Sequence, residues 1–139
     1  LRQTWLDVIA ELGGAEQLVI GGKSLGGRIA SMVADDVGVR GLVCLGYPFH
    51  PAGRPDRLRT AHLMQLQTPA LILQGERDPM GSRSEVESYL LSPRIRVQWL
   101  PDGDHSYRPR RITGVTEAES LQTVVEAVTA FVGHLPTRW

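Results

Sequence analysis

Three residues of this sequence have the types that nucleophilic acyl transfer requires. They are Ser24, Asp78 and His105. A serine hydroxyl is a poor nucleophile at neutral pH, so it needs a histidine to accept its proton and usually a carboxylate to orient that histidine. Such a trio predicts cleavage of an ester, thioester or amide through a covalent acyl intermediate.

The local sequence around Ser24 favours its role as the nucleophile. Gly22-Lys-Ser-Leu-Gly26 matches the pattern G-x-S-x-G and stands between an apolar segment and a helical one. A serine at such a strand-to-helix turn has strained backbone angles, and glycines two residues away on each side remove Cβ atoms that would collide. The following helix points its N-terminus at the serine, so we expect the Leu25 N–H to stabilise an oxyanion.

Ser24 has two alternative interpretations. Gly22-Lys-Ser24 is also how a phosphate-binding P-loop ends, but that motif needs a glycine five positions before Gly22, where this chain has Gln17. Without the glycine-rich loop the phosphate cradle is not built. The other alternative is a tight turn whose serine is incidental, and the local pattern alone leaves it open.

Of the four histidines, His105 is the predicted base. It lies just after a strand-like apolar segment and before the final helix. His50 follows an earlier strand but precedes the acid, so we expect it at the edge of a pocket instead. His62 falls in a predicted helix and His134 near the end of the last one, and both are expected at the surface.

Asp78 is the predicted orienting acid. It stands three residues past a predicted strand and 27 residues before His105, which leaves room for one helix and one strand. Glu76 is the alternative acid. Asp102 and Asp104 lie closer to the histidine in sequence, but carboxylates beside a glycine in a loop commonly form turns.

The segments that must position these residues alternate between strands and helices. Short apolar runs bounded by glycine or proline predict strands at residues 17–21, 39–46, 69–75 and 95–100. Apolar residues at helical spacing predict a helix ending at Gly13-Gly14, helices over 25–36, 83–91 and 116–132, and a short one near 58–66. Thr116 and Glu119 form a capping box for the last helix. This order predicts an α/β fold: a parallel, doubly wound sheet with helices on both faces, in three α/β/α layers.

Further residues are expected beside the nucleophile or in the core. Lys23 is predicted to line the substrate site and attract an anionic group. Tyr47 and His50 are predicted to line the same site, with packing of their loop on the core as the alternative. Buried positions are predicted at Cys44, Trp99, Leu121, Val124, Val125 and Val128.

Composition excludes several other classes of protein. The 139 residues include 15 Lys+Arg and 15 Asp+Glu, and this zero net charge argues against binding of a nucleic-acid backbone. No apolar run approaches the ~20 residues of a membrane span. One cysteine permits neither an intrachain disulfide nor a multi-cysteine zinc site. We therefore expect no metal, no organic cofactor, no nucleic acid and no membrane, a small acyl compound as substrate, and a cytoplasmic location.

Four segments together make the chain resemble the α/β-hydrolase fold family. They are Gly21-Gly-Lys-Ser-Leu-Gly-Gly-Arg28, Gly46-Tyr-Pro-Phe-His-Pro51, Leu71-Ile-Leu-Gln-Gly-Glu-Arg-Asp78 and Pro101-Asp-Gly-Asp-His105. The chain is similar in particular to small hydrolases related to dienelactone hydrolases, among them homologues of testis-expressed and NSL-complex proteins. That resemblance implies Ser24 as nucleophile, Asp78 as orienting acid, and His105 as general base and acid.

The same resemblance implies a larger fold than these residues supply. A complete fold of this kind has about eight strands, whereas four are predicted here and the chain opens with Leu1 inside a helical pattern. We therefore expect residues 1–139 to be the C-terminal half of a single domain, with an upstream loop donating the second oxyanion N–H. A non-catalytic scaffold for protein binding is the alternative function, since a fold does not determine function.

Overall fold

The centre of the protein is a parallel sheet of four strands, which run in the spatial order β1-β2-β3-β4. The computed structural model describes residues 1–136. Its strands are β1 (Val19–Lys23), β2 (Gly41–Leu45), β3 (Ala70–Gly75) and β4 (Ile95–Leu100). Each strand pairs with the next one along the chain, so all four carboxyl ends meet at the same edge of the sheet.

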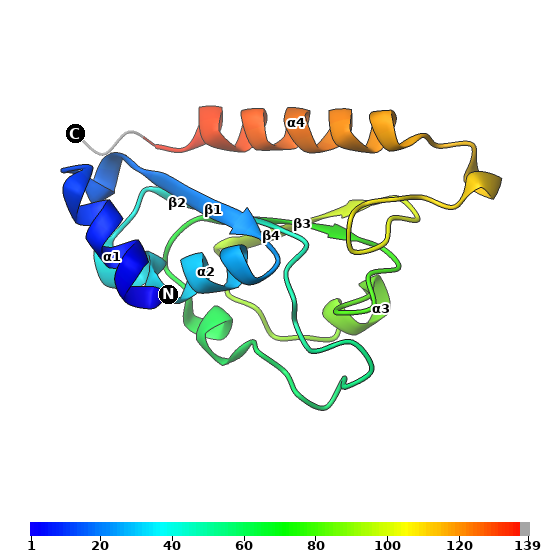
Figure 1. Ribbon diagram of the computed structural model, residues 1–139, viewed down its shortest axis with the longest axis horizontal. Helices are drawn as coiled ribbons and strands as arrows, with labels where there is room; N and C mark the ends of the chain where they lie inside the picture. The colour runs from blue at the N-terminus through cyan, green and yellow to red at the C-terminus, as the bar shows by residue number, and fades with distance from the viewer. Residues whose placement is uncertain (137–139) are drawn as a thin grey trace.

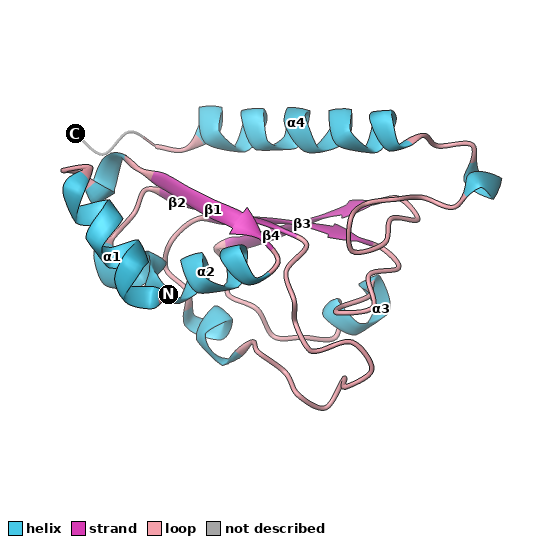
Figure 2. Cartoon of the chain, viewed as in Figure 1, coloured by secondary structure: helices cyan, strands magenta, loops and turns pink. Residues whose placement is uncertain are grey.

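Helices cover both faces of this sheet, as predicted (Figures 1 and 2). The helices are α1 (Arg2–Glu11), α2 (Leu25–Val37), α3 (Arg83–Val86) and α4 (Glu117–His134). Short 3-10 helices form at Ala15–Gln17, Ala61–Gln65 and Arg111–Thr113. In Figure 1 the long α4 lies along one face, while α1 and α2 lie on the other. No helix of residues 1–136 is long and apolar enough to cross a membrane.

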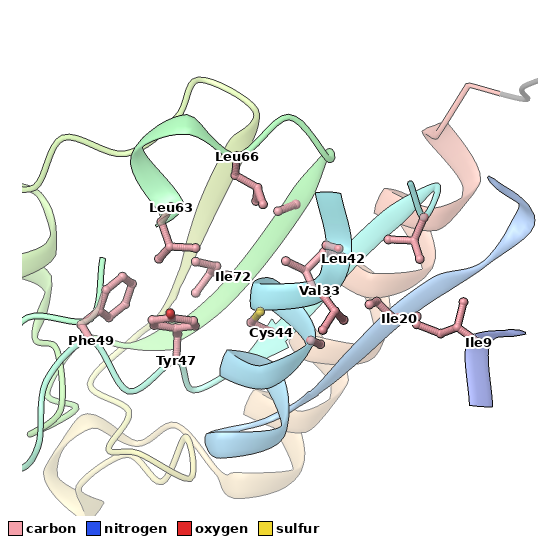
Figure 3. Packing of buried hydrophobic residues seen from close by; sticks show 14 of the residues in the cluster. Ile9, Ile20, Val33, Leu42, Cys44, Tyr47, Phe49, Leu63, Leu66 and Ile72 are labelled. Carbon is pink, nitrogen blue, oxygen red and sulfur yellow. The ribbon is translucent and has the colours of Figure 1, made fainter. Parts of the chain in front are cut away.

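The alternation of side chains along β3 divides the hydrophobic core into two clusters. Ala70 and Ile72 belong to the larger cluster, which lies on the α2 side of the sheet and includes Tyr47 and Phe49 (Figure 3). Leu71 and Leu73 point to the opposite face and pack with α4. Because both faces are covered, every residue of β3 is buried, which explains its continuous apolar run.

Helix α4 confirms the predicted cap but buries a different stripe from the one expected. The Glu119 N–H donates to Thr116 Oγ1 at 3.1 Å, and the Thr116 N–H donates to the Glu119 carboxylate at 3.1 Å. Val124 is buried and Val128 half-buried, as predicted. Leu121 and Val125 are 62% and 51% exposed, so their prediction as core was wrong. They follow the inward positions by one residue, which turns them about 100° around the helix axis.

Several element boundaries also differ from the predictions, and two of these differences have clear local reasons. The first strand begins at Val19 instead of residue 17, because residues 15–17 form a 3-10 turn in which Gln17 N donates to Gly14 O and Leu18 N donates to Ala15 O. Helix α3 ends at Val86 instead of residue 91. Beyond it, Ser88 and Tyr89 donate to carbonyls three residues back, so the chain tightens and leaves the helix.

Candidate active site

The structure brings the three predicted residues into one hydrogen-bonded row at the carboxyl edge of the sheet. Ser24 directly follows β1, Asp78 follows β3 and His105 follows β4. His105 Nε2 lies 3.0 Å from Ser24 Oγ, and His105 Nδ1 lies 2.7 Å from Asp78 Oδ2. Residues 81 positions apart in the chain thus meet because their strands run parallel in one sheet.

Ser24 sits on a strained turn. Its φ of 52° and ψ of −118° lie outside the regions favoured by residues other than glycine. The turn is held from both sides, because the Ser24 N–H donates to Leu45 O at 2.9 Å and the Ser24 carbonyl accepts from Arg28 N at 3.0 Å. Helix α2 begins at Leu25, so the Leu25 N–H is among the first-turn amides that have no partner within the helix.

The glycines around Ser24 do not share the steric role equally. A Cβ on Gly22 would lie 2.6 Å from the Gly26 carbonyl carbon, so Gly22 must lack a side chain. A Cβ on Gly26 would meet nothing within 4 Å. The second close approach falls instead on Gly27, whose Cβ would lie 2.6 Å from Gly22 O. The expectation that a Cβ would collide on both sides of Ser24 is therefore confirmed at Gly22 and wrong at Gly26, and the second glycine with a steric role is Gly27.

The hydrogen bonds of Asp78 determine where the protons of this row reside. Asp78 is fully buried, and both of its carboxylate oxygens accept hydrogen bonds. Oδ1 accepts from Met80 N at 2.8 Å, while Oδ2 accepts from Gln74 Nε2 at 3.1 Å and from His105 Nδ1. A carboxylate with these partners can only accept, so Nδ1 of His105 carries the proton. The lone pair of Nε2 is therefore free to accept the Ser24 hydroxyl proton.

The loop that carries His105 is fixed by close backbone packing against the ends of two strands. A Cβ on Gly75 would lie 2.7 Å from the Gly103 carbonyl carbon, and one on Gly46 would lie 3.0 Å from His105 O. The Tyr107 hydroxyl donates to Leu73 O at 2.6 Å, and burial raises the pKa of that hydroxyl. These contacts hold the half-buried imidazole over Ser24.

The alternative acids are engaged elsewhere. The Asp102 carboxylate pairs with Arg110, which lowers the pKa of Asp102 to about 2. Asp104 Oδ1 accepts from the amides of residues 106 and 108, as predicted for a turn-forming carboxylate. Glu76 accepts from Asp102 N and from Arg83, and these two contacts lower the pKa of Glu76. None of the three accepts a hydrogen bond from His105 in the described part of the chain.

Lys23 directly precedes Ser24 and lies beside the row. Its ammonium donates a long hydrogen bond of 3.4 Å to Ser106 Oγ. Both residues line a surface hollow of about 460 Å³, whose other lining residues include Tyr107, Arg108, Glu117 and Leu121. The chain neighbours of Ser24 and His105 thus form one wall of an open, mixed-charge hollow.

Tyr47 and His50 are buried in the structure instead of lining an open site. Tyr47 is fully buried, and its hydroxyl donates to Arg59 O at 3.0 Å. His50 is 2% exposed, and its ring nitrogens face Pro51 O at 2.8 Å and the Glu85 carboxylate at 3.0 Å. The structure therefore agrees with the alternative in which this loop packs on the core.

His62 also differs from the sequence prediction. It was expected at the surface, but it is half-buried, and its Nε2 lies 2.8 Å from Ser31 Oγ on α2. Burial and the nearby Arg28 lower the pKa of His62, with Asp35 acting in the opposite direction. The segment near 58–66 is too short for its apolar pattern to show which face is buried, so nothing in the sequence indicated that His62 contacts α2. His134 is exposed, as expected.

The described residues offer neither a cysteine nucleophile nor a metal site beside the row. Cys44 is fully buried as predicted, and burial raises the pKa of its thiol to about 12, so it is not a competing nucleophile. No group of three or more His, Cys, Asp or Glu side chains in residues 1–136 is placed to hold a metal ion. One residue beside the row was not predicted from the sequence. It is Gln74, whose buried side-chain amide donates to Asp78.

The chain matches a family of known proteins over almost its whole length. The family is described as "Alpha/beta hydrolase domain", and the match covers residues 1–133.

Several solved structures have a similar fold. One is an alpha-beta serine hydrolase homologue from Coxiella burnetii, with 22% identity, a TM-score of 0.58, and coverage of 74% of this chain and 48% of that one. Another is an a/b serine hydrolase without lid from Xanthomonas campestris, with 18% identity, a TM-score of 0.66, and coverage of 99% and 56%. A third is a thermophilic esterase from Thermogutta terrifontis, with 16% identity, a TM-score of 0.67, and coverage of 94% and 70%.

At these identities the likeness concerns the fold. The matched part spans about half the length of the first two structures. The four parallel strands and their helices correspond to part of that larger fold.

Proposed function

Because the chain belongs to the alpha/beta hydrolase domain family, we propose that it is a serine hydrolase that cleaves an ester, thioester or amide through an acyl-enzyme. The observation that carries this proposal is the row Ser24–His105–Asp78, with separations of 3.0 and 2.7 Å. The proton positions in that row also support it, since the buried carboxylate leaves Nε2 of His105 as the acceptor.

In the first half of the reaction, Ser24 Oγ attacks the carbonyl carbon while its proton passes to His105 Nε2. The imidazolium that forms is stabilised by Asp78, which is fully buried and keeps Nδ1 oriented. The negative charge on the former carbonyl oxygen is stabilised by the Leu25 N–H at the start of α2. When the tetrahedral species collapses, His105 gives its proton to the leaving alcohol, thiol or amine, and the acyl group stays on Ser24.

In the second half, His105 takes a proton from water, and the resulting nucleophile attacks the acyl carbon. The carbonyl oxygen again becomes an oxyanion, and collapse releases the carboxylic acid as His105 returns the proton to Ser24. No step needs a metal or redox partner, and every proton moves through the same imidazole nitrogen. The hollow beside Lys23 and Ser106 is the proposed place for one side of the substrate.

The test is labelling by a fluorescent fluorophosphonate, which phosphonylates an activated serine and expels fluoride. It uses the folded protein as expressed from its gene. Labelling of the wild type and its loss in Ser24→Ala are expected. Ser31→Ala is the matched control, because Ser31 also has a histidine nitrogen 2.8 Å from its hydroxyl, and its removal should leave labelling unchanged.

The opposite results would overturn the proposal. If the folded gene product is not labelled, the row does not activate its serine, and a binding role for the fold becomes the better explanation. If Ser24→Ala is still labelled, another nucleophile reacts and the assignment of Ser24 fails.

A further inference from the structure

The end of β3 carries a polar side chain where an apolar one would suffice for packing. Gln74 is fully buried, and it follows Ala70 and Ile72 on the face of β3 that packs into the larger hydrophobic cluster. A buried amide is costly unless each polar atom finds a partner. Its presence in an otherwise apolar strand therefore needs an explanation beyond core filling.

Every polar atom of the Gln74 carboxamide has a partner. Oε1 accepts from Tyr47 N at 2.8 Å, and Nε2 lies 3.1 Å from each of Tyr47 O, Asp78 Oδ2 and Gly81 O. This orientation of the amide is unambiguous. The Tyr47 N–H can only donate, so the atom facing it is the oxygen, and the atom facing three oxygens is the nitrogen.

These contacts join two parts of the site. Tyr47 lies just past the end of β2, and its backbone is held by both ends of the Gln74 amide. Asp78 and Gly81 belong to the loop after β3. A Cβ on Gly81 would come within 3.2 Å of Gln74 Nε2 and 2.6 Å of the Phe49 ring, so this loop is closely fitted around the amide.

Gln74 acts on the same carboxylate oxygen as the histidine. Asp78 Oδ2 accepts from both Gln74 Nε2 and His105 Nδ1, while Oδ1 accepts from Met80 N. Without the Gln74 donor, Oδ2 would be held by the histidine alone, and Met80 N on Oδ1 would be the only other hydrogen bond that restrains the carboxylate. The amide thus fixes Oδ2 in the position from which it orients the imidazole.

We infer that Gln74 is a positioning residue that holds the Asp78 carboxylate toward His105. It touches none of the reacting atoms and acts through Asp78 alone. The inference rests on the proposed function, because it assigns Gln74 to the same row. It adds that the end of β2, through the Tyr47 backbone, is part of what orients the acid.

The test is a double-mutant cycle of Gln74→Met and Asp78→Asn, read as the rate of fluorophosphonate labelling. Methionine keeps the length of the side chain and removes its hydrogen bonds. Gln74→Met alone should slow labelling by about 10²-fold, the effect of a misplaced catalytic group. In the Asp78→Asn background it should cause no further slowing, because the residue that it positions is already disabled.

Thr68→Val is the matched control. Thr68 is 4% exposed, and its hydroxyl donates a part-buried hydrogen bond to Asp35. It precedes β3, whereas Asp78 follows the opposite end of that strand. It should lower stability without changing the labelling rate. Equal slowing by Gln74→Met in both backgrounds, or no slowing in a folded variant, would overturn the inference.

A second readout separates this inference from the proposed function. In proton NMR, the His105 Nδ1–H held by a carboxylate gives a far-downfield resonance. That resonance should persist in Thr68→Val and be lost or shifted upfield in Gln74→Met, whether or not the wild type is labelled. If Gln74→Met does not fold, the Gln74 side-chain amide signals are compared between wild type and Asp78→Asn. A shift supports the inference, and unchanged signals contradict it.

Discussion

The protein contains two serine–histidine pairs with almost the same geometry and opposite proton arrangements. Ser24 Oγ lies 3.0 Å from His105 Nε2, and Ser31 Oγ lies 2.8 Å from His62 Nε2. Judged by distance alone, Ser31 would be the better candidate for a nucleophile that a histidine activates. The groups around each pair decide what the serine can do.

At the second pair, the hydroxyl protons point away from the imidazole. Ser31 Oγ donates to Arg28 O at 2.6 Å, and Tyr47 Oη donates to Arg59 O at 3.0 Å. Burial raises the pKa of Tyr47 to about 12, so this hydroxyl keeps its proton. Both oxygens must then accept from His62 Nε2, which lies 2.8 and 3.4 Å from them and carries the hydrogen. His62 is therefore a donor here and cannot take a proton from Ser31.

At the first pair, a third residue reverses this arrangement. Asp78 accepts from Nδ1 of His105, which leaves Nε2 without a proton. Access differs as well, because Ser31 is 2% exposed within α2 whereas Ser24 is half-buried on a turn at the edge of the sheet. A short serine–histidine distance is thus insufficient. The acid behind the histidine and the exposure of the serine make the difference.

The largest effect should come from removing the group that distinguishes the pairs. Asp78→Asn keeps the shape of the side chain but offers an amide to His105, which favours the wrong tautomer. The rate of fluorophosphonate labelling should fall by about 10⁴-fold, as in a serine protease whose orienting aspartate was changed in this way. Asp35→Asn, near the second pair, is the control and should label at the wild-type rate. If Asp78→Asn is labelled at the wild-type rate, Asp78 is not what distinguishes the Ser24–His105 pair from the Ser31–His62 pair.

The next largest effect is expected from a change in the backbone of the turn that carries Ser24. Gly22→Ala places a Cβ 2.6 Å from the Gly26 carbonyl carbon, so the turn at Ser24 must open. We expect a loss of about 1–3 kcal/mol in the free energy of unfolding, together with much slower labelling. Gly26→Ala is the matched variant, because its Cβ meets nothing within 4 Å, and it should keep both properties. Urea unfolding and labelling measure the two, and equal behaviour of the variants would contradict the prediction.

A smaller effect is expected at the second pair. Ser31→Ala removes the hydroxyl that bonds to Arg28 O and accepts from His62. The cost should be about 1 kcal/mol of unfolding free energy, since one well-satisfied hydroxyl contributes modestly, with labelling unchanged. Urea titration gives the first quantity. A drop in labelling by the folded variant would show that the two pairs are coupled.

The smallest effect is a pH dependence of stability at His62. Its pKa is lowered in the folded protein by burial and by Arg28, so the unfolded chain binds this proton more readily. The free energy of unfolding should therefore fall as the pH drops below about 6.5, the ordinary value for histidine. His62→Gln should lose less stability than the wild type between about pH 7 and pH 5, as measured by urea midpoints. Equal losses would mean that His62 titrates alike in both states.

Much of this fold was readable from the sequence because its signals are local. The apolar runs at β3 and β4 and the glycines beside Ser24 reflect short-range requirements of strands and turns. Their alternation with helices predicts parallel strands, and parallel strands place residues that follow them at one edge. That logic distinguishes Asp78 and His105 from the other carboxylates and from the other three histidines of the chain.

The predictions that were wrong concern the burial of single side chains, which depends on how helices and loops pack against the sheet. Leu121 and Val125 have core-like side chains, but the rotation of α4 on the sheet leaves them exposed. His62 was predicted at the surface, but in the structure it contacts Ser31 on α2 and Tyr47 in the loop after β2. Tyr47 and His50 follow a strand that points toward the site, yet their loop turns back into the core.

The order of strands and helices could be predicted from the sequence, and so could the positions of Ser24, Asp78 and His105 after three of the strands. Those features depend on residue type and on spacing along the chain. The folded chain was needed to identify the histidine nitrogen that carries a proton, the glycines that must lack a side chain, and the contact of Gln74 with Asp78. These depend on how side chains and backbone atoms lie within about 3 Å of one another in the folded chain, because hydrogen bonding and steric contact act at that range.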